Sequence, residues 1–188
     1  MSTTLQIVAV SGSLRAPSTT NLLLEAVLDE IERAVPVERQ VLELRTLAVD
    51  LARALTAGAV SAPVLAAQQA VAEADIVVVG TPIYRGAYTG LFKDFFDLLH
   101  HDALADTPVL LTAGGGNDQH SLAIDHELRP LFAFFRAHTL PIGVYARSAD
   151  FAEGRIIGTA LPAAVTRAVE AALPVLKARA AASPLSTI

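Results

Sequence analysis

A regular alternation of short apolar runs with longer helical segments constrains the fold more than any other feature of the sequence. Five runs have the length and composition of strands, and they lie at Leu5–Val10, Val37–Leu44, Ile76–Gly80, Val109–Ala113 and Leu140–Tyr145. Five segments carry apolar residues at helical spacing, and these are Thr19–Ala34, Pro63–Ala74, Thr89–His101, Ser121–Ala137 and Leu161–Ala182. Such an alternation predicts an α/β protein with a doubly wound parallel sheet and right-handed crossovers.

The composition agrees with one large core. Hydrophobic residues make up 53% of the chain and charged residues 18%, and buried parallel strands read as apolar runs of this kind. We expect a single domain over residues 1–188, with 183–188 as a loose tail. Val37–Leu44 is more polar than the other strands and suits an edge of the sheet. Pro130 lies inside the fourth helix and predicts a kink or a broken turn there. For the connections 45–62 and 146–159 the sequence predicts no regular secondary structure.

Several classes of function are disfavoured by what the sequence lacks. The chain has no cysteine, which removes thiol nucleophiles, disulfide redox pairs and cysteine-ligated metals. Its net charge of −5 and the absence of a basic stripe argue against nucleic acid. We expect no signal peptide and no membrane span, and therefore a cytoplasmic protein. No metal site is expected either, because His100 and His101 would point apart on a helix without a nearby carboxylate cluster.

The loop that follows the first strand carries most of the chemistry. Residues 11–20 read Ser-Gly-Ser-Leu-Arg-Ala-Pro-Ser-Thr-Thr, with five hydroxyls and one arginine before a helix. A helix N-terminus offers unpaired N–H groups and the positive end of a dipole, so it favours an anion. Hydroxyls add neutral donors, and Arg15 can fork onto two phosphate oxygens. A turn with an N-cap at Ser18 is the alternative, but capping explains only one of these hydroxyls.

The residues that this loop lacks indicate which kind of phosphate group it binds. A dinucleotide-binding turn needs G-x-G-x-x-G, and only Gly12 is present. A P-loop needs G-K-[ST], and the loop has no lysine. A cradle of hydroxyls suits a terminal monophosphate instead, such as that of FMN. The predicted phosphate ligands are Ser11, Ser13, Arg15, Ser18, Thr19 and Thr20.

Two motifs in the same order resemble the NADPH-dependent FMN reductase family. The first is the segment Gly12–Ser18, and the second is Gly80–Lys93, which reads GTPIYRGAYTGLFK. The resemblance extends over nearly the whole chain. Within the family, the sequence is most similar to the flavin reductases of alkanesulfonate and methanesulfonate monooxygenase systems. It implies a flavodoxin-like fold with strand order 2-1-3-4-5 and helices on both faces. It also implies FMN and NADPH or NADH as ligands, and a flavin-dependent monooxygenase as the partner that receives reduced FMN.

Two further loops lie at the same edge of the predicted sheet. By the resemblance, Pro82, Ile83, Tyr84 and Arg85 lie along the isoalloxazine ring and the phosphate. After the fourth strand, a run of glycines permits a close approach of backbone to a ligand. Thr112, Gly114, Gly115 and Gly116 are therefore candidates for the far edge of the ring, and His120 for the flavin or nicotinamide pocket. Ordinary turns or a flexible loop are the alternatives.

The third and fourth predicted helices carry more apolar residues than one buried stripe requires. Phe92 and Phe96 add a second apolar face to the segment 89–101, and the segment 121–137 shows the same excess. We expect a homodimer or homotetramer that forms through these two helices, with burial inside a monomer as the alternative. The resemblance also places His126 where some sulfonate-system reductases carry a tyrosine, at a helical irregularity.

Hydride transfer from a nicotinamide to flavin N5 needs no nucleophile or base from the protein. The sequence accordingly predicts no catalytic side chain. Three alternatives stay open: an FMN-bound reductase of quinones, azo dyes or metal ions, a non-enzymatic electron carrier like flavodoxin, and a flavin-free binding module. Flavodoxins tend to be more acidic and have a threonine-rich phosphate loop of another pattern.

Overall fold

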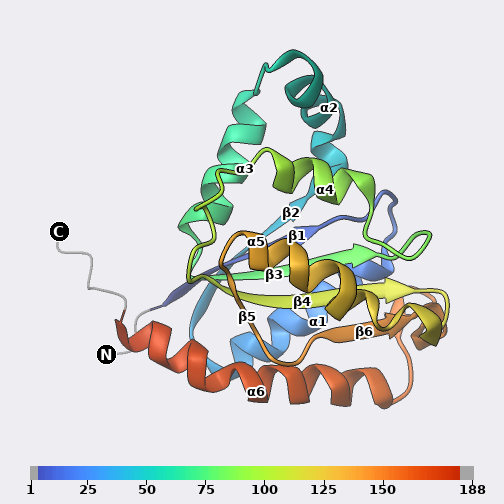
Figure 1. Cartoon of the computed structure of the whole chain (residues 1–188). Helices are drawn as coiled ribbons and strands as arrows, with labels where there is room; N and C mark the ends of the chain where they lie inside the picture. Colours follow the sequence, from blue (N-terminus) through green and yellow to red (C-terminus); the bar gives the residue numbers. More distant parts are fainter. Residues whose placement is uncertain (1–3, 183–188) are drawn as a thin grey trace.

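The computed structural model describes residues 4–182 and contains one parallel sheet at its centre (Figure 1). Its strands are β1 (Leu5–Ser11), β2 (Val37–Glu43), β3 (Ile76–Pro82), β4 (Pro108–Gly115), β5 (His138–Thr139) and β6 (Val144–Arg147). The order is β2-β1-β3-β4-β5, and β6 also pairs with β4. This confirms the predicted flavodoxin-like order, with β2 at an edge. The predicted loose tail, 183–188, lies outside the described residues.

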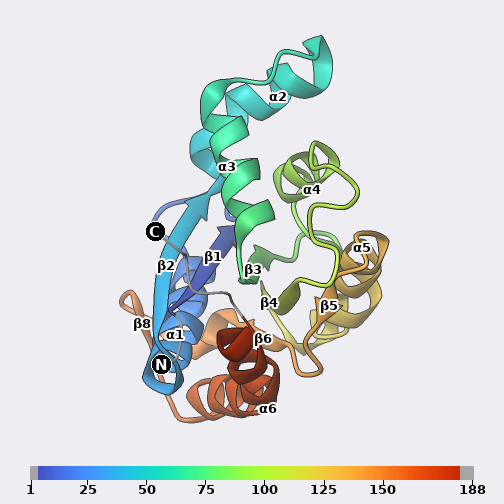
Figure 2. The same cartoon turned by 90° about the vertical axis from the view of Figure 1, so that its left-hand side faces the viewer.

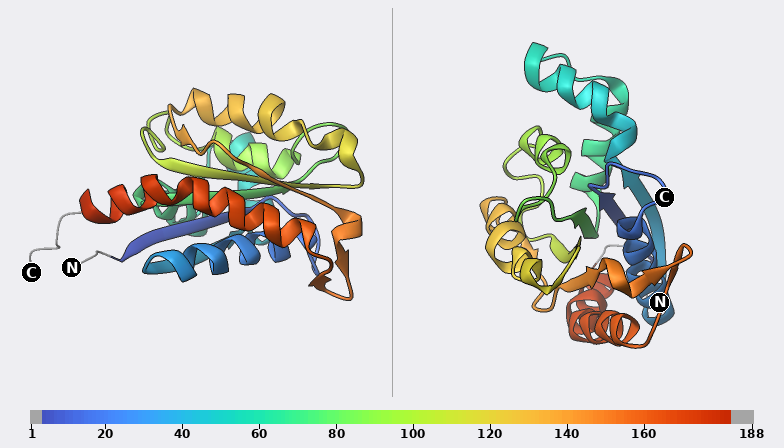
Figure 3. Two further views of the ribbon diagram at one scale, coloured as in Figure 1. Left: turned by 90° about the horizontal axis from the view of Figure 1, so that it is seen from below. Right: turned by 90° about the vertical axis from the view of Figure 1, so that its right-hand side faces the viewer.

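Helices cover both faces of the sheet, as predicted (Figures 2 and 3). On one face lie α1 (Thr19–Ala34) and α6 (Ala160–Ala182), and on the other lie α3 (Ala62–Glu73), α4 (Gly90–Asp97) and α5 (Arg129–Phe134). Alternate residues of each strand point to opposite faces. In β1, for example, Val8 and Val10 join the core under α3 and α4, while Ile7 and Ala9 join the core under α1 and α6.

The connection 45–62, for which the sequence predicted no structure, contains a helix. A short 3₁₀ turn at Leu44–Leu47 leads into α2 (Ala48–Ala57), whose residues Leu51 and Ala54 are buried. Gly58 ends α2 in the left-handed conformation, with φ of 66°. Among the described residues no single helix is long and apolar enough to cross a membrane. The segments Leu44–Ala57 and Ala62–Glu73 reach that length only together, across a 96° bend.

The third predicted helix, Thr89–His101, is shorter than expected. Thr89 is the N-cap of α4, and the helix ends at Asp97. His100 and His101 therefore lie in a turn, and the expectation that they point apart was wrong. Their ring centroids are 4.1 Å apart, and Asp102 Oδ2 lies 3.1 Å from His101 Nε2. The carboxylate that the sequence did not place beside these histidines is thus adjacent to them, and it is also paired with Arg136.

The predicted helix Ser121–Ala137 is broken, as Pro130 indicated. A π-helical turn at Ile124–Leu128 comes first, and α5 begins at Arg129 with Pro130 in its first turn. Proline is tolerated there because the first N–H groups of a helix have no partner within it. His126 lies in the π-helical turn, so the predicted irregularity at this residue is confirmed.

Of the fifth predicted strand, Leu140–Tyr145, residues 144 and 145 belong to β6, and residues 140–143 belong to no strand. β5 and β6 lie on either side of the segment 140–143, which pairs less regularly with the sheet. Pro141 has no N–H to donate, and Gly143 passes so close to Ile124 that an added Cβ would lie 2.7 Å from its Cγ2. Arg129 donates to the carbonyl oxygens of residues 140 and 141, each at 3.0 Å. The connection 146–159, also without a predicted structure, holds a small hairpin of β7 (Phe151–Ala152) and β8 (Arg155–Ile156).

The surplus phenylalanines pack inside the chain, which removes most of the reason to expect a subunit contact from them. Five of them are at most 2% exposed: Phe92, Phe95, Phe96, Phe132 and Phe135. Phe96 lies at the centre of this cluster, with ring centroids 4.7 Å from Phe92 and 5.0 Å from Phe132. In the predicted segments 89–101 and 121–137, the exposed large apolar side chains are Leu122, at 61%, and Phe134, at 68%. Burial within the monomer, the alternative explanation, therefore accounts for most of the excess.

Candidate functional site

The loops after β1, β3, β4 and β6 meet at the carboxyl edge of the sheet, where the strand arrows end in Figure 1. Doubly wound sheets bind ligands at this edge. A groove of about 160 Å³ lies there. It is lined by Thr19, Thr20, Pro82, Ile83, Tyr84, Gly114, Gly115, Gly116, Ala146, Arg147, Ser148 and Phe151. Eight of the residues predicted from the sequence are therefore brought together, from three separate loops.

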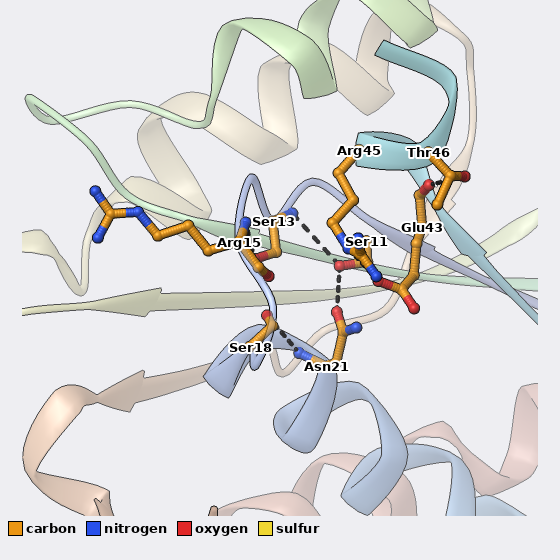
Figure 4. A network of polar contacts seen from close by, with 8 residues as sticks. All are labelled: Ser11, Ser13, Arg15, Ser18, Asn21, Glu43, Arg45 and Thr46. Atoms are coloured by element: carbon orange, nitrogen blue, oxygen red, sulfur yellow. Dashed lines mark hydrogen bonds and ion pairs between the residues drawn. The ribbon is translucent and has the colours of Figure 1, made fainter.

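Hydrogen bonds within the loop after β1 set its shape (Figure 4). Ser18 caps α1, because its Oγ accepts from the Asn21 N–H at 3.2 Å. Ser11 Oγ donates to Asn21 Oδ1 at 2.5 Å, and Ser13 Oγ donates to the Arg15 carbonyl at 3.2 Å. The N-cap at Ser18, which the sequence offered as the alternative to a phosphate ligand, is present, and Ser11 and Ser13 also have partners inside the loop. Asn21, which was not among the predicted site residues, ties the strand end to the helix start.

A second set of contacts fastens this loop to α4. Thr89 Oγ1 donates to the Gly12 carbonyl at 2.8 Å and accepts from the Phe92 N–H at 3.2 Å. Gly12 has no room for a side chain, since an added Cβ would lie 2.8 Å from Phe92 Cδ2. Thr19 and Thr20, in the first turn of α1, line the groove.

Arg15 lies apart from the hydroxyls of its own loop. Figure 4 shows its side chain extending away from Ser11, Ser13 and Asn21. Arg15 instead lines a second groove of about 420 Å³, together with Ile83, Tyr84, Arg85 and His120. Because Ile83 and Tyr84 line both grooves, the two are neighbours along the Tyr84 loop.

The Tyr84 loop is a tight two-residue turn. Tyr84 and Ala87 exchange backbone hydrogen bonds of 2.9 and 3.3 Å across Arg85 and Gly86. Both central residues have positive φ, 56° for Arg85 and 90° for Gly86. The Ile83 N–H donates to the Gly114 carbonyl at 2.7 Å, which joins this loop to the glycine run.

The glycine run packs against β6. An added Cβ at Gly115 would clash with Tyr145 Oη and lie 3.3 Å from His120 Cβ. Tyr145 Oη donates to the Asn117 carbonyl at 2.5 Å, and partial burial raises the pKa of the Tyr145 hydroxyl. Thr112, in contrast, is fully buried and donates to the Val79 carbonyl at 2.8 Å, so its side chain is not among the groove residues.

The loop after β6 contributes residues that were not predicted from the sequence. Arg147, Ser148 and Phe151 line the first groove. Arg147 Nη2 lies 3.0 Å from Asp150 Oδ1. Burial acts to raise the pKa of the Asp150 carboxyl, but the hydrogen bonds from Arg147 outweigh it and hold that pKa below its ordinary value. The rule that loops after parallel strands meet at one edge, applied to the fifth strand, would have found these residues.

Comparison with known proteins agrees with this geometry. The family model described as NADPH-dependent FMN reductase matches residues 5–152. The chain therefore belongs to the NADPH-dependent FMN reductase family, as its two motifs predicted.

Among its relatives is the NADH-dependent FMN reductase SfnF of Pseudomonas fluorescens, which is 47% identical over 93% of both chains. Another is the FMN reductase (NADPH) of Pseudomonas aeruginosa, 44% identical over 95% of this chain and 96% of the relative. A solved oxidoreductase from Corynebacterium diphtheriae is 33% identical and superposes with a TM-score of 0.82, covering 94% of this chain and 98% of its own.

Proposed function

We propose that the protein is an NAD(P)H-dependent FMN reductase. The observation that carries the proposal is the meeting of the hydroxyl-rich loop, the Tyr84 loop and the glycine run at one groove, in a chain of this family. The relatives named above are FMN reductases that use NADH or NADPH. Hydride transfer to a flavin explains why the groove holds no nucleophile paired with a base.

The donors at the start of α1 fit the phosphate of FMN. Thr19 and Thr20 line the groove, and the N–H groups of the first helical turn have no partner within the helix. We assign the phosphate to these donors, with Ser13 and Ser18 shaping the loop. No charged side chain is needed, since a helix N-terminus already favours an anion.

The backbone of the two other loops fits a flat ring. Pro82, Ile83 and Tyr84 line the groove beside Gly114–Gly116, to which the Ile83 N–H is hydrogen-bonded. Gly116 has no atom within 4 Å of an added Cβ, so the space beside it is open. When bound, FMN supplies the hydride-accepting N5. Backbone donors and acceptors of these two loops would hold and orient the ring.

The experiment that tests this function follows oxidation of NADH and NADPH by the purified protein, with and without added FMN. Turnover that depends on free FMN supports a reductase that uses flavin as a substrate. A yellow protein that oxidises NAD(P)H only when a quinone, an azo dye or a metal ion is supplied would instead show the alternative reductase. No oxidation under any of these conditions would contradict the proposal and leave an electron carrier or a binding module.

A paired comparison tests the phosphate site. Thr20→Val removes a buried hydroxyl that lines the groove, so FMN affinity should fall about tenfold while riboflavin affinity stays nearly constant. Thr56→Val, on the exposed surface of α2, is the matched control. Equal losses for FMN and riboflavin would show that the hydroxyl does not contact the phosphate.

The reduced FMN would pass to a flavin-dependent monooxygenase of the sulfonate type, as the motif resemblance suggests. A cytoplasmic location accompanies this role, because NAD(P)H and the acceptor flavin are both supplied there. Adding a sulfonate monooxygenase and its sulfonate substrate to the reductase, FMN and NAD(P)H under anaerobic conditions should yield sulfite only after oxygen is admitted.

We also propose a homo-oligomer, now on narrower grounds than the sequence suggested. Phe134 is exposed beside a cavity of about 580 Å³ that Tyr88, Leu99 and Leu131 also line. An exposed phenylalanine next to such a cavity favours a contact between copies. Light scattering of wild type and Phe134→Asp tests this: the variant should have the lower mass, and a monomeric wild type would contradict the proposal.

A further inference from the structure

A cluster of metal-ligating side chains lies outside both grooves, in the connection between α4 and β4. His100, His101 and Asp102 follow one another there, and all three are exposed. This connection leads back to the start of β4, at the edge of the sheet opposite the strand arrowheads (Figure 1). One ligand atom of each residue, a ring nitrogen or a carboxylate oxygen, lies within 4.8 Å of the other two. Imidazole and carboxylate are donors that Zn²⁺ and related transition metals accept.

The spacing of these side chains suits a single small ion. Asp102 Oδ2 lies 3.1 Å from His101 Nε2, and the ring centroids of His100 and His101 are 4.1 Å apart. Two ligand atoms at about 2.0–2.1 Å from a tetrahedral Zn²⁺ lie about 3.3 Å from each other. The His101 nitrogen and the Asp102 oxygen therefore already have the separation of two zinc ligands, and the exposed His100 ring lies beside them.

Neighbouring contacts hold the cluster in place. Leu104 is fully buried, and the Ala103 N–H donates to the His100 carbonyl at 2.9 Å. The Asp102 N–H lies 3.3 Å from His100 Nδ1 and orients that ring. Arg136 pairs with Oδ1 of Asp102, so Oδ2 is the carboxylate oxygen on the histidine side. Ligating carboxylates are commonly held by an outer hydrogen bond of this kind, which fixes their orientation toward a metal.

The charges around the cluster permit a cation. Two cationic side chains lie near it, and each has an anionic partner. Arg136 is paired with Asp102, and Lys93, which lines the cavity beside the two histidines, lies 2.5 Å from Asp97. The Arg136 side chain is 66% exposed, so water and salt screen its charge. The chain as a whole carries a net charge of −5, which also favours a cation.

We propose that His100, His101 and Asp102 bind one divalent transition-metal ion of the Zn²⁺, Ni²⁺ or Cu²⁺ class. Because the three side chains are exposed, water fills the remaining coordination positions. The ion joins the end of α4, through Asp102, to Arg136 in front of β5. An ion that binds only the folded chain stabilises it. The site is separate from the flavin groove, and the proposal is independent of the reductase function.

Equilibrium dialysis of the full chain against Zn²⁺, with chelator-treated protein that carries no histidine tag, tests the site. We expect one Zn²⁺ per chain and much weaker binding of Mg²⁺, which prefers oxygen ligands. His100→Ala, His101→Ala and Asp102→Asn should each weaken Zn²⁺ binding about tenfold or more, because even the loss of a residue that only orients a ligand typically costs that much. Zn²⁺ should raise the Tm of wild type and leave that of His101→Ala unchanged.

Two matched controls show whether a loss is specific. His126→Ala and His138→Ala remove exposed histidines from other parts of the chain and should bind Zn²⁺ as wild type does. Urea unfolding without metal shows that each variant folds. A wild type that binds no Zn²⁺, or an affinity that all three cluster variants keep, would overturn the inference. A loss in Asp102→Asn alone would also overturn it, since the histidines would then not be ligands.

Discussion

The Tyr145 hydroxyl occupies the space that a side chain at Gly115 would need. Tyr145 belongs to β6 and Gly115 to the end of β4, and the hydroxyl continues past the glycine to the Asn117 carbonyl at 2.5 Å. The glycine at this position is therefore required by a contact across the sheet, in addition to any need for the ligand. Through this contact, the wall of the first groove at Gly115 lies next to His120, which lines the second groove.

Gly115→Ala should disturb this wall. The new methyl group must displace Tyr145 or the glycine run, so we expect a loss of about 1–3 kcal/mol in the free energy of unfolding and weaker FMN binding. Urea unfolding and fluorescence titration with FMN measure the two effects. Gly116→Ala is the matched control, because nothing lies within 4 Å of its added Cβ. Equal behaviour of the two variants would disprove the role of Tyr145.

Tyr145→Phe should partly relieve the clash that Gly115→Ala creates. Without the hydroxyl, the nearest atom of the ring is Cζ, 3.1 Å from the added Cβ. The double variant should therefore lose less stability than the two single losses added together, with a coupling of about 0.5–3 kcal/mol. Urea unfolding of the four proteins gives the coupling directly, and strict additivity would mean that the two residues do not interact.

Phe96→Ala should be among the most destabilising substitutions. Its ring is 1% exposed and touches four other phenylalanines, so the expected cost is about 3–5 kcal/mol. Phe134→Ala, at 68% exposure, removes the same side chain and should cost less than about 0.5 kcal/mol for the monomer. Denaturant unfolding at low protein concentration measures both, and a small cost at Phe96 would contradict the placement of this cluster in the core.

Asp150→Asn should remove a contribution to stability that depends on pH. Arg147 holds the folded-state pKa of Asp150 below its ordinary value, so the ionised carboxylate stabilises the fold above about pH 4. That contribution is lost as the pH falls through the lowered folded pKa. Because Arg147 is partly exposed, we expect less than about 1 kcal/mol at neutral pH.

Urea unfolding at pH 7, 5 and 3 checks this expectation. The gap between wild type and Asp150→Asn should be full at pH 7 and 5 and smaller at pH 3. Glu153→Gln, which alters an ion pair whose side chains are 75% and 81% exposed, is the control and should show almost no gap. A gap at Asp150 that persists unchanged at pH 3 would show that its charge is not the cause.

The sequence by itself determined the α/β class, the helix Thr19–Ala34 and the placement of three loops at one edge. Each of these follows from local spacing, because apolar runs and helical periodicity report on neighbouring residues. The residues of the loop before α1 also predicted an anion site on their own, since so many hydroxyls directly before a helix exceed what capping requires.

The tertiary structure alone decided which side chains from separate loops meet. The break at Leu140–Gly143 depends on Arg129 and Ile124, and neither contact is visible in strand periodicity. The phenylalanines of α4 and α5 form a surplus in the sequence, and only the packing of the two helices shows that they are buried together. Arg15 lies on a loop that predicts phosphate binding, yet it lines another groove with Arg85 and His120. The spacing of residues along the chain does not predict such tertiary contacts, because they depend on the path of the backbone between the loops.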